Sequence, residues 1–154
     1  MNCTFHEGEL DHADVRALLA RHFAEMRAGS PPSACHVLTA DALKDRAIRF
    51  FTVRDEAGSL FGCGALKLLA ADHGEIKSMR TADAALGSGV GRRMLDHLTT
   101  VARAAGMTRL SLETGTGDLF AAANRLYQRA GYVPTGPFGG YVRSDFTTFY
   151  MREI

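Results

Sequence analysis

Apolar side chains near the start of the chain follow the period of a helix. They recur every three or four positions between residues 11 and 28, at Val15, Leu18, Leu19, Phe23 and Met26. This spacing predicts an amphipathic helix over residues 11–28, with Asp11 as its N-cap. The Gly-Ser-Pro-Pro-Ser run at 29–33 ends that helix, and a short second helix with a Thr39 cap is expected over 39–43.

Farther along, the pattern changes to that of strands. Residues 48–53 and 60–69 are predicted strands joined by a hairpin turn at 55–58. The remaining elements are expected in the order strand 75–81, helix 90–105, strand 109–113, helix 119–130, and strands near 132–134 and 146–152. A hairpin followed by strand–helix–strand–helix–strand predicts a mixed α/β sheet with a parallel crossover in its middle.

The composition is typical of one globular domain, expected over residues 1–154. The chain is 46% hydrophobic and 23% charged, with 16 Gly and 4 Pro, and its length allows a real core. No apolar run approaches the roughly 20 residues that span a bilayer, and the N-terminus lacks the pattern of a secretory signal. We therefore expect no membrane partner and a cytoplasmic location.

Charge and cysteine content exclude two further classes. A net charge of +1 provides no overall field to recruit nucleic acid, so no nucleic-acid partner is expected and any anion site must be local. The cysteines, Cys3, Cys35 and Cys63, are odd in number and far apart. Disulfides and a cysteine zinc site are therefore not expected, and no metal is predicted.

The most informative segment is a glycine-rich turn between the strand at 75–81 and the helix at 90–105. It reads Leu-Gly-Ser-Gly-Val-Gly-Arg-Arg over residues 86–93. Glycines allow main-chain N–H groups to approach a ligand closely, and a helix start adds free donors and the positive end of a dipole. The segment predicts a pocket for a phosphate or pyrophosphate. A tight turn without a ligand is the alternative.

Two better-known phosphate loops fit this segment poorly. A P-loop ends in Gly-Lys-Ser/Thr, whereas Gly91 is followed by Arg92 and Arg93. A dinucleotide-binding turn counted from Gly87 needs glycine where Arg92 stands, and it should open the first βαβ unit of a longer chain.

The turn and a second segment resemble the acetyl-CoA-binding parts of the GNAT N-acetyltransferase superfamily. The usual run there is Arg/Gln-x-x-Gly-x-Gly/Ala, and Gly89 and Gly91 fill its two small positions. The second segment, residues 120–127 followed by Ala-Gly-Tyr at 130–132, is similar to the superfamily's helix that ends in Leu-Tyr before Gly-Phe/Tyr. The resemblance covers nearly the whole chain, and the stretches at 64–67, 75–79, 112–115 and 136–139 resemble the bacterial YsnE-type subgroup.

This resemblance implies both a fold and a co-substrate. The fold would be a mixed, mostly antiparallel α/β sheet, splayed in the middle, with about four helices on its faces. Acetyl-CoA would be the co-substrate, with its pantetheine arm lying in the splay. The residues expected to contact it are Met79, Arg80, Thr81, Leu86, Gly87, Ser88, Gly89, Val90, Gly91, Arg92, Phe120 and Asn124.

Two positions depart from the superfamily pattern. Leu86 stands where Arg or Gln is usual, which predicts weaker cofactor binding, because one side-chain contact beside the pyrophosphate is missing. Phe120 replaces a common Asn that contacts the pantetheine arm. Asn124 could supply that polar contact instead, or it could be an ordinary exposed residue of the helix.

The resemblance also implies direct transfer of acetyl from acetyl-CoA to a primary amine in a ternary complex. Tyr127 matches the family's general acid, and a main-chain N–H near Met79 would polarise the thioester carbonyl. Glu75 is the candidate base, since some family members use a Glu at this point of the strand. A Glu75 that faces solvent or pairs with a Lys is the alternative.

The acceptor would be a small-molecule amine or an exposed amino group of a peptide. Candidate acceptor-binding residues are His22, Glu25, His36, Glu113 and Tyr141, although each histidine alone could be structural. The alternative function is an acetyl-CoA-binding module of the same fold with little or no catalysis. Many superfamily members pair as dimers, so a homodimer is possible here.

Overall fold

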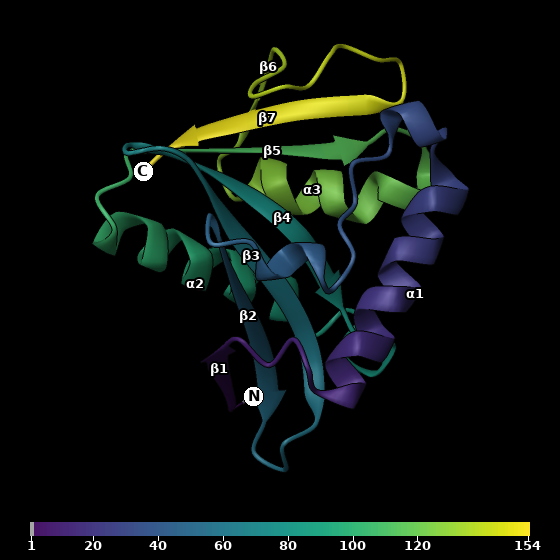
Figure 1. Cartoon of the computed structure of the whole chain (residues 1–154), viewed down its shortest axis with the longest axis vertical. Helices are drawn as coiled ribbons and strands as arrows, with labels where there is room; N and C mark the ends of the chain where they lie inside the picture. Colours follow the sequence, from purple (N-terminus) through teal and green to yellow (C-terminus); the bar gives the residue numbers. More distant parts are fainter. Residues whose placement is uncertain (1) are drawn as a thin grey trace.

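Seven strands and three α-helices make up the fold of the part described by the computed structural model, residues 2–154 (Figure 1). Met1 lies outside the described residues. The strands are β1 (Cys3–Glu7), β2 (Ile48–Asp55), β3 (Leu60–Ala70), β4 (His73–Thr81), β5 (Arg109–Gly115), β6 (Val133–Thr135) and β7 (Thr147–Glu153). The α-helices are α1 (Ala13–Gly29), α2 (Val90–Ala104) and α3 (Ala121–Arg129).

The strands form one sheet in the order β1-β2-β3-β4-β5-β7-β6. All neighbours are antiparallel except β4 and β5, which are parallel because α2 crosses over between them. Pairing between β4 and β5 stops after three rungs, of which the last joins Glu75 to Ser111. Beyond that rung β5 continues to pair with β7, as far as Gly115. The predicted mixed, mostly antiparallel sheet with a splayed centre is therefore confirmed.

Three details of the sequence prediction are corrected by the structure. β1 was not expected. The helix predicted over 39–43 is a 3₁₀ turn at Ala42–Lys44, so three α-helices are described instead of about four, although the Thr39 hydroxyl does accept a hydrogen bond from the Ala42 N–H at 3.2 Å. Asp11 does not cap α1. The N-cap is His12, and the Asp11 carboxylate accepts a hydrogen bond from Lys44 Nζ at 2.7 Å.

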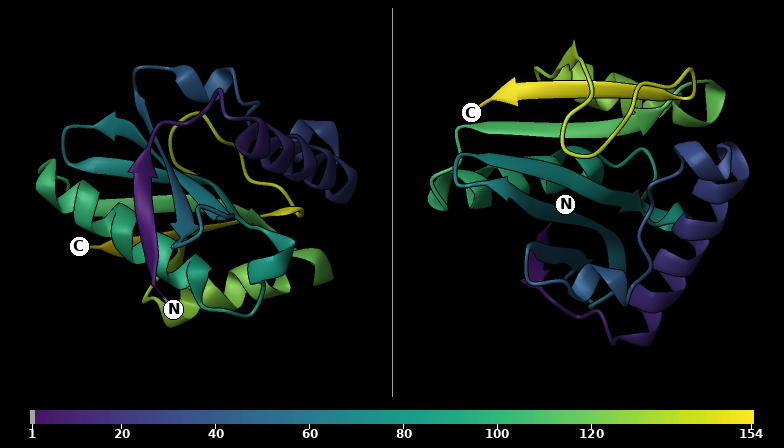
Figure 2. Two further views of the ribbon diagram at one scale, coloured as in Figure 1. Left: turned by 90° about the horizontal axis from the view of Figure 1, so that it is seen from below. Right: turned by 45° about the horizontal axis from the view of Figure 1, so that its top comes forward.

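The helices cover the two faces of the sheet unequally. α1 lies on one face, and α2 and α3 lie on the other (Figure 2, left). Strand alternation supplies both cores, since Phe50 packs in the α1-side core with Val15 and Leu19, whereas Phe51 packs in the larger core on the opposite face. Gly64 of β3 lets α2 approach closely, because a Cβ there would lie 2.8 Å from Met94 Cγ.

Candidate active site

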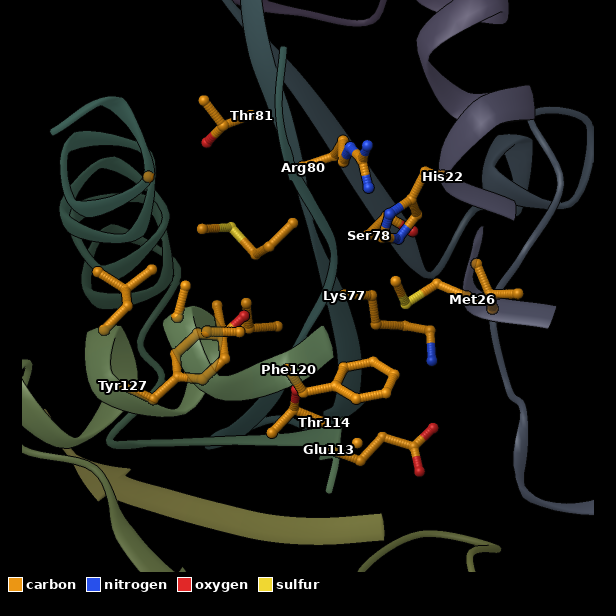
Figure 3. A pocket seen from close by; sticks show the side chains of 18 of the residues that line it. His22, Met26, Lys77, Ser78, Arg80, Thr81, Glu113, Thr114, Phe120 and Tyr127 are labelled. Atoms are coloured by element: carbon orange, nitrogen blue, oxygen red, sulfur yellow. The ribbon is translucent and has the colours of Figure 1, made fainter. Parts of the chain in front are cut away.

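A cavity of about 910 Å³ opens where β4 and β5 separate. Figure 3 shows its two sides, with Tyr127 on one side of β4 and the α1 residues His22 and Met26 on the other. Predicted site residues that line the cavity are His22, His36, Glu75, Met79, Arg80, Thr81, Leu86, Gly87, Gly89, Val90, Gly91, Arg92, Glu113, Phe120 and Tyr127. The structure thus brings residues from both halves of the sequence around one space.

A β-bulge lies in β4 at the cavity. Cys63 pairs with Arg80 and Ala65 with Lys77, so Gly64 alone faces two residues, Ser78 and Met79. Ser78 has a φ of 54°, which is unusual for a residue other than glycine. A bulge leaves a residue outside the regular ladder and re-aims the backbone. Main-chain groups at Ser78 and Met79 are therefore placed at the cavity wall, out of register with β3.

The glycine turn leads into the start of α2 through two residues with left-handed backbone. Gly87 and Gly89 have φ angles of 75° and 85°, in the left-handed region that favours glycine. The N-cap of α2 is Gly89, and no side chain caps the helix. The Arg93 N–H bonds the Gly89 carbonyl, so the N–H groups of residues 90–92 precede the first intrahelical bond and remain available to a ligand.

Leu86 and Phe120, the two residues that depart from the superfamily pattern, differ in exposure and in packing. Leu86 lies at the cavity edge and is 66% exposed, so it adds no polar contact there. Phe120 is buried, and its ring packs so closely on Gly115 of β5 that a Cβ on Gly115 would lie 2.2–2.5 Å from three ring atoms. Glycine at position 115 therefore provides the space that the Phe120 ring occupies at the cavity wall.

Tyr127 of α3 is almost fully buried yet reaches the cavity. Its ring meets Tyr132 edge-on, with centroids 5.9 Å apart. Burial raises the pKa of the Tyr127 phenol above its usual value. The phenol is therefore protonated at neutral pH, and among residues 2–154 no group accepts a hydrogen bond from it, so it can donate to a ligand.

Glu75 lies at the vertex of the splay, only 1% exposed. Its Oε2 accepts hydrogen bonds from Lys77 Nζ at 3.1 Å and from the Tyr141 hydroxyl at 2.6 Å, and Lys77 Nζ also donates to the Tyr141 oxygen at 2.7 Å. Lys77 was not singled out from the sequence. Its position two residues after Glu75 places both side chains on the same face of the strand, which could have predicted the pairing.

His36 and Glu113 form a second polar pair on the wall. His36 Nδ1 lies 2.8 and 2.9 Å from the two oxygens of the Glu113 carboxylate. Burial raises the pKa of Glu113, and the hydrogen bond from His36 opposes that shift. The His36 ring also packs against Tyr141, with centroids 4.7 Å apart.

His22 and Arg80 share the α1 side of the cavity. His22 is buried, its Nδ1 has no hydrogen-bond partner in the described part of the chain, and burial with the nearby Arg80 charge lowers its pKa to about 4. Arg80 Nη1 donates to Glu25, which holds the pKa of that carboxyl below its usual value.

Four predicted site residues do not line the cavity: Ser88, Glu25, Asn124 and Tyr141. The Asn124 amide donates to the carbonyls of Gly115 and Phe120, and its oxygen accepts from the Tyr150 hydroxyl. These bonds join α3 to β5 and β7. In this structure the Asn124 side chain is thus engaged with the protein and does not line the cavity.

Two features are absent from residues 2–154. No group of three or more His, Cys, Asp or Glu side chains there is arranged to hold a metal ion. None of the helices combines the length and apolar character needed to cross a membrane.

Comparison with known proteins identifies close relatives. A profile of the acetyltransferase (GNAT) family matches residues 14–132. The uncharacterized N-acetyltransferase YedL of Escherichia coli is 42% identical over 151 residues, which cover 98% of this chain and 94% of the relative. The uncharacterized N-acetyltransferase YsnE of Bacillus subtilis is 37% identical over 146 residues, covering 95% and 96%. The predicted resemblance to the YsnE-type subgroup is therefore confirmed.

Solved structures agree with these relatives. A Klebsiella pneumoniae protein described as an acyl-CoA N-acyltransferase superposes with a TM-score of 0.80 at 26% identity, covering 98% of this chain and 97% of that one. Since a family profile spans most of the chain and its relatives match over nearly their full length, this protein is a member of the acetyltransferase (GNAT) family and hence an acyltransferase.

Proposed function

We propose that this chain transfers an acetyl group from acetyl-CoA to a primary amine by direct attack in a ternary complex. The observation that carries the proposal is that one cavity, at the splay, is shared by all of the following groups. Its wall includes the open glycine turn and Tyr127 as well as the carboxylates Glu75 and Glu113. A phosphate-binding turn, a proton donor and two proton acceptors thus border the same space.

The residues present fit the diphosphate and arm of coenzyme A. Free N–H groups at the start of α2 suit an anion, and no atom lies within 4 Å of an added Cβ at Gly87 or Gly89, so the approach is open. When bound, acetyl-CoA supplies the acetyl group as a thioester. The bulge at Ser78 and Met79 presents main-chain groups to the middle of the cavity, where an N–H near Met79 would polarise the carbonyl oxygen.

The transfer needs two proton movements by residues of this chain. The amine arrives as an ammonium, and Glu75 receives its proton directly or through a water. The amine nitrogen then forms a bond to the carbonyl carbon while the carbon–sulfur bond breaks and the sulfur keeps the electron pair. The nitrogen, now bonded to carbon, releases its second surplus proton to solvent and becomes the neutral amide. Tyr127 donates its phenolic proton to that sulfur and regains one from solvent.

Glu75 is the proposed base because it lies at the vertex of the splay and borders the cavity. Its bonds to Lys77 and Tyr141 fix the carboxylate in one orientation. Glu75→Gln keeps the shape of the side chain but cannot accept a proton, so we expect turnover to fall by about 10²-fold or more. A full retention of turnover in this variant would remove Glu75 from the base role.

The experiment for the whole proposal combines a binding and a turnover measurement. Acetyl-CoA should raise the melting temperature, and free-thiol release should depend on an amine from a panel of small amines and peptides. Stabilisation without release on any amine would favour the binding module. If high concentrations of acetyl-CoA leave the melting temperature unchanged, the proposal is wrong.

A further inference from the structure

Lys77 and Glu113 occupy corresponding positions on the two separating strands. The last rung of the β4–β5 ladder pairs Glu75 with Ser111, and Lys77 and Glu113 each lie two residues farther on. Side chains two residues apart share a face of the strand, so Lys77 and Glu113 would be opposite each other if the ladder continued. Figure 3 shows both side chains at the cavity.

The two side chains nevertheless do not form an ion pair with each other. Lys77 Nζ turns back to Glu75 at 3.1 Å and to the Tyr141 hydroxyl at 2.7 Å. No contact within 4.0 Å joins Lys77 to Glu113 in residues 2–154. Lys77, the cation that the strand register would place opposite Glu113, therefore pairs with Glu75 instead.

Glu113 is thus the carboxylate on the cavity wall that no Lys or Arg of the described chain pairs with. Its only polar partner there is His36 Nδ1, which holds both oxygens at 2.8 and 2.9 Å. The Glu113 side chain keeps 14% of its surface exposed and that of His36 29%. The carboxylate is fixed in orientation. The charge of Lys77 acts on it from a distance, but no Lys or Arg of residues 2–154 forms an ion pair with it within 4.0 Å.

We infer that Glu113 binds the ammonium group of the acceptor, with His36 as a positioning residue, and that the acceptor is therefore an alkyl amine that arrives charged. This inference rests on the proposed acetyl transfer. An alkyl ammonium, with a pKa near 10, is charged at neutral pH, and it supplies the direct ion-pair partner that Glu113 lacks. Glu75, on the neighbouring strand, lies at the vertex, two residues before the position opposite Glu113.

The alternative is that the His36–Glu113 pair merely ties the segment after α1 to β5. A structural pair would affect all acceptors alike when it is broken. A pair that binds ammonium would discriminate between charged and uncharged amines.

The test compares two probe amines, phenethylamine, which is charged at neutral pH, and aniline, which is not. In Glu113→Gln we expect the KM for phenethylamine to rise about 10- to 100-fold, the factor that loss of a charged hydrogen bond produces. The KM for aniline should change less than twofold, and the kcat for both amines and the affinity for acetyl-CoA should be retained. Glu56→Gln, at an exposed turn, controls for the loss of one negative charge.

His36 is tested by rescue. His36→Ala should raise the KM for phenethylamine in the same direction, and His36→Asn, whose amide can replace the Nδ1 donor, should restore part of it. Melting temperatures of all variants establish that they are folded.

Equal changes in KM for the two amines, or a loss of kcat without a change in KM, would overturn the inference. If acetyl-CoA binds but neither amine is acetylated, the proposed transfer to amines is wrong for these acceptors. The inference about Glu113 is then tested separately, by calorimetric titration of phenethylammonium into the protein with coenzyme A bound. Binding that is weakened in Glu113→Gln supports it, and binding of equal strength in both proteins refutes it.

Discussion

The buried imidazole of His22 makes the stability of the fold sensitive to mild acid. His22 lies on the inner face of α1 with 8% of its surface exposed. Burial is the main cause that lowers the pKa of His22, and the positive charge of Arg80 is the second. The perturbation to make is His22→Gln, which removes the titrating group but keeps a polar side chain of similar length.

The size of the effect follows from the pKa of His22, which falls from 6.5 to about 4 on folding. Between these values the unfolded chain binds a proton that the folded chain does not, so stability falls as the pH drops below 6.5. At 1.36 kcal/mol per pKa unit, the loss is about 2 kcal/mol at pH 5 and about 3 kcal/mol at pH 4 and below. Above pH 7 the group makes no pH-dependent contribution.

The assay is urea denaturation of both proteins at several pH values from 4 to 8. Carboxylates that titrate in this range do so in both proteins, so the difference between the two free energies of unfolding isolates His22. We expect that difference to shift by about 2 kcal/mol in favour of His22→Gln between pH 7 and pH 5. His12→Gln, at the exposed start of α1, controls for the loss of an imidazole. A difference that stays constant with pH would refute the reasoning.

Three further predictions concern the cavity. Tyr127→Phe should lower turnover about 10²-fold or more with acetyl-CoA affinity nearly unchanged, because it removes only the donated proton; unchanged turnover in a thiol-release assay would exclude Tyr127 as the acid. Leu86→Arg should tighten acetyl-CoA binding about threefold, a gain that salt should abolish because the position is exposed; no gain in titrations at low salt would mean that main-chain donors already suffice. Gly115→Ala should destabilise the fold by about 1–3 kcal/mol through the clash with Phe120; denaturation should show partial recovery in Gly115→Ala combined with Phe120→Leu, and equal stability of wild type and Gly115→Ala would contradict the packing.

Local patterns made part of the fold predictable. The stripe over residues 11–28 corresponds to α1 (Ala13–Gly29), and the glycine turn is followed by α2 at Val90–Ala104, because helix period, glycine and helix start are all encoded by neighbouring residues. The parallel crossover followed from element order alone. β1 was missed because five residues near the chain end give too short an alternation to distinguish a strand from a loop, and their pairing with β2 is a tertiary contact.

The acceptor side of the site depends on contacts that no local pattern contains. His36 and Glu113 were named as separate candidates, but they meet across 77 positions of sequence. The bulge that gives Ser78 a positive φ depends on how β3 and β4 pair, and serine does not signal such a conformation. The alternatives for Asn124 also involve distant contacts, since its amide donates to the carbonyls of Gly115 and Phe120 and its oxygen accepts from Tyr150.

The splay also leaves part of a central strand unpaired on one edge. β4 pairs with β3 along its length. Its other edge pairs with β5 only from His73 to Glu75. From Lys77 onward the strand changes from buried to partly exposed although it lies in the middle of the sheet. An unpaired strand edge carries N–H and C=O groups that must find partners, in water or in a ligand with amides of its own. A pantetheine arm has such amides, so the same break in pairing that opens the cavity favours the extended, amide-bearing co-substrate that we propose for it.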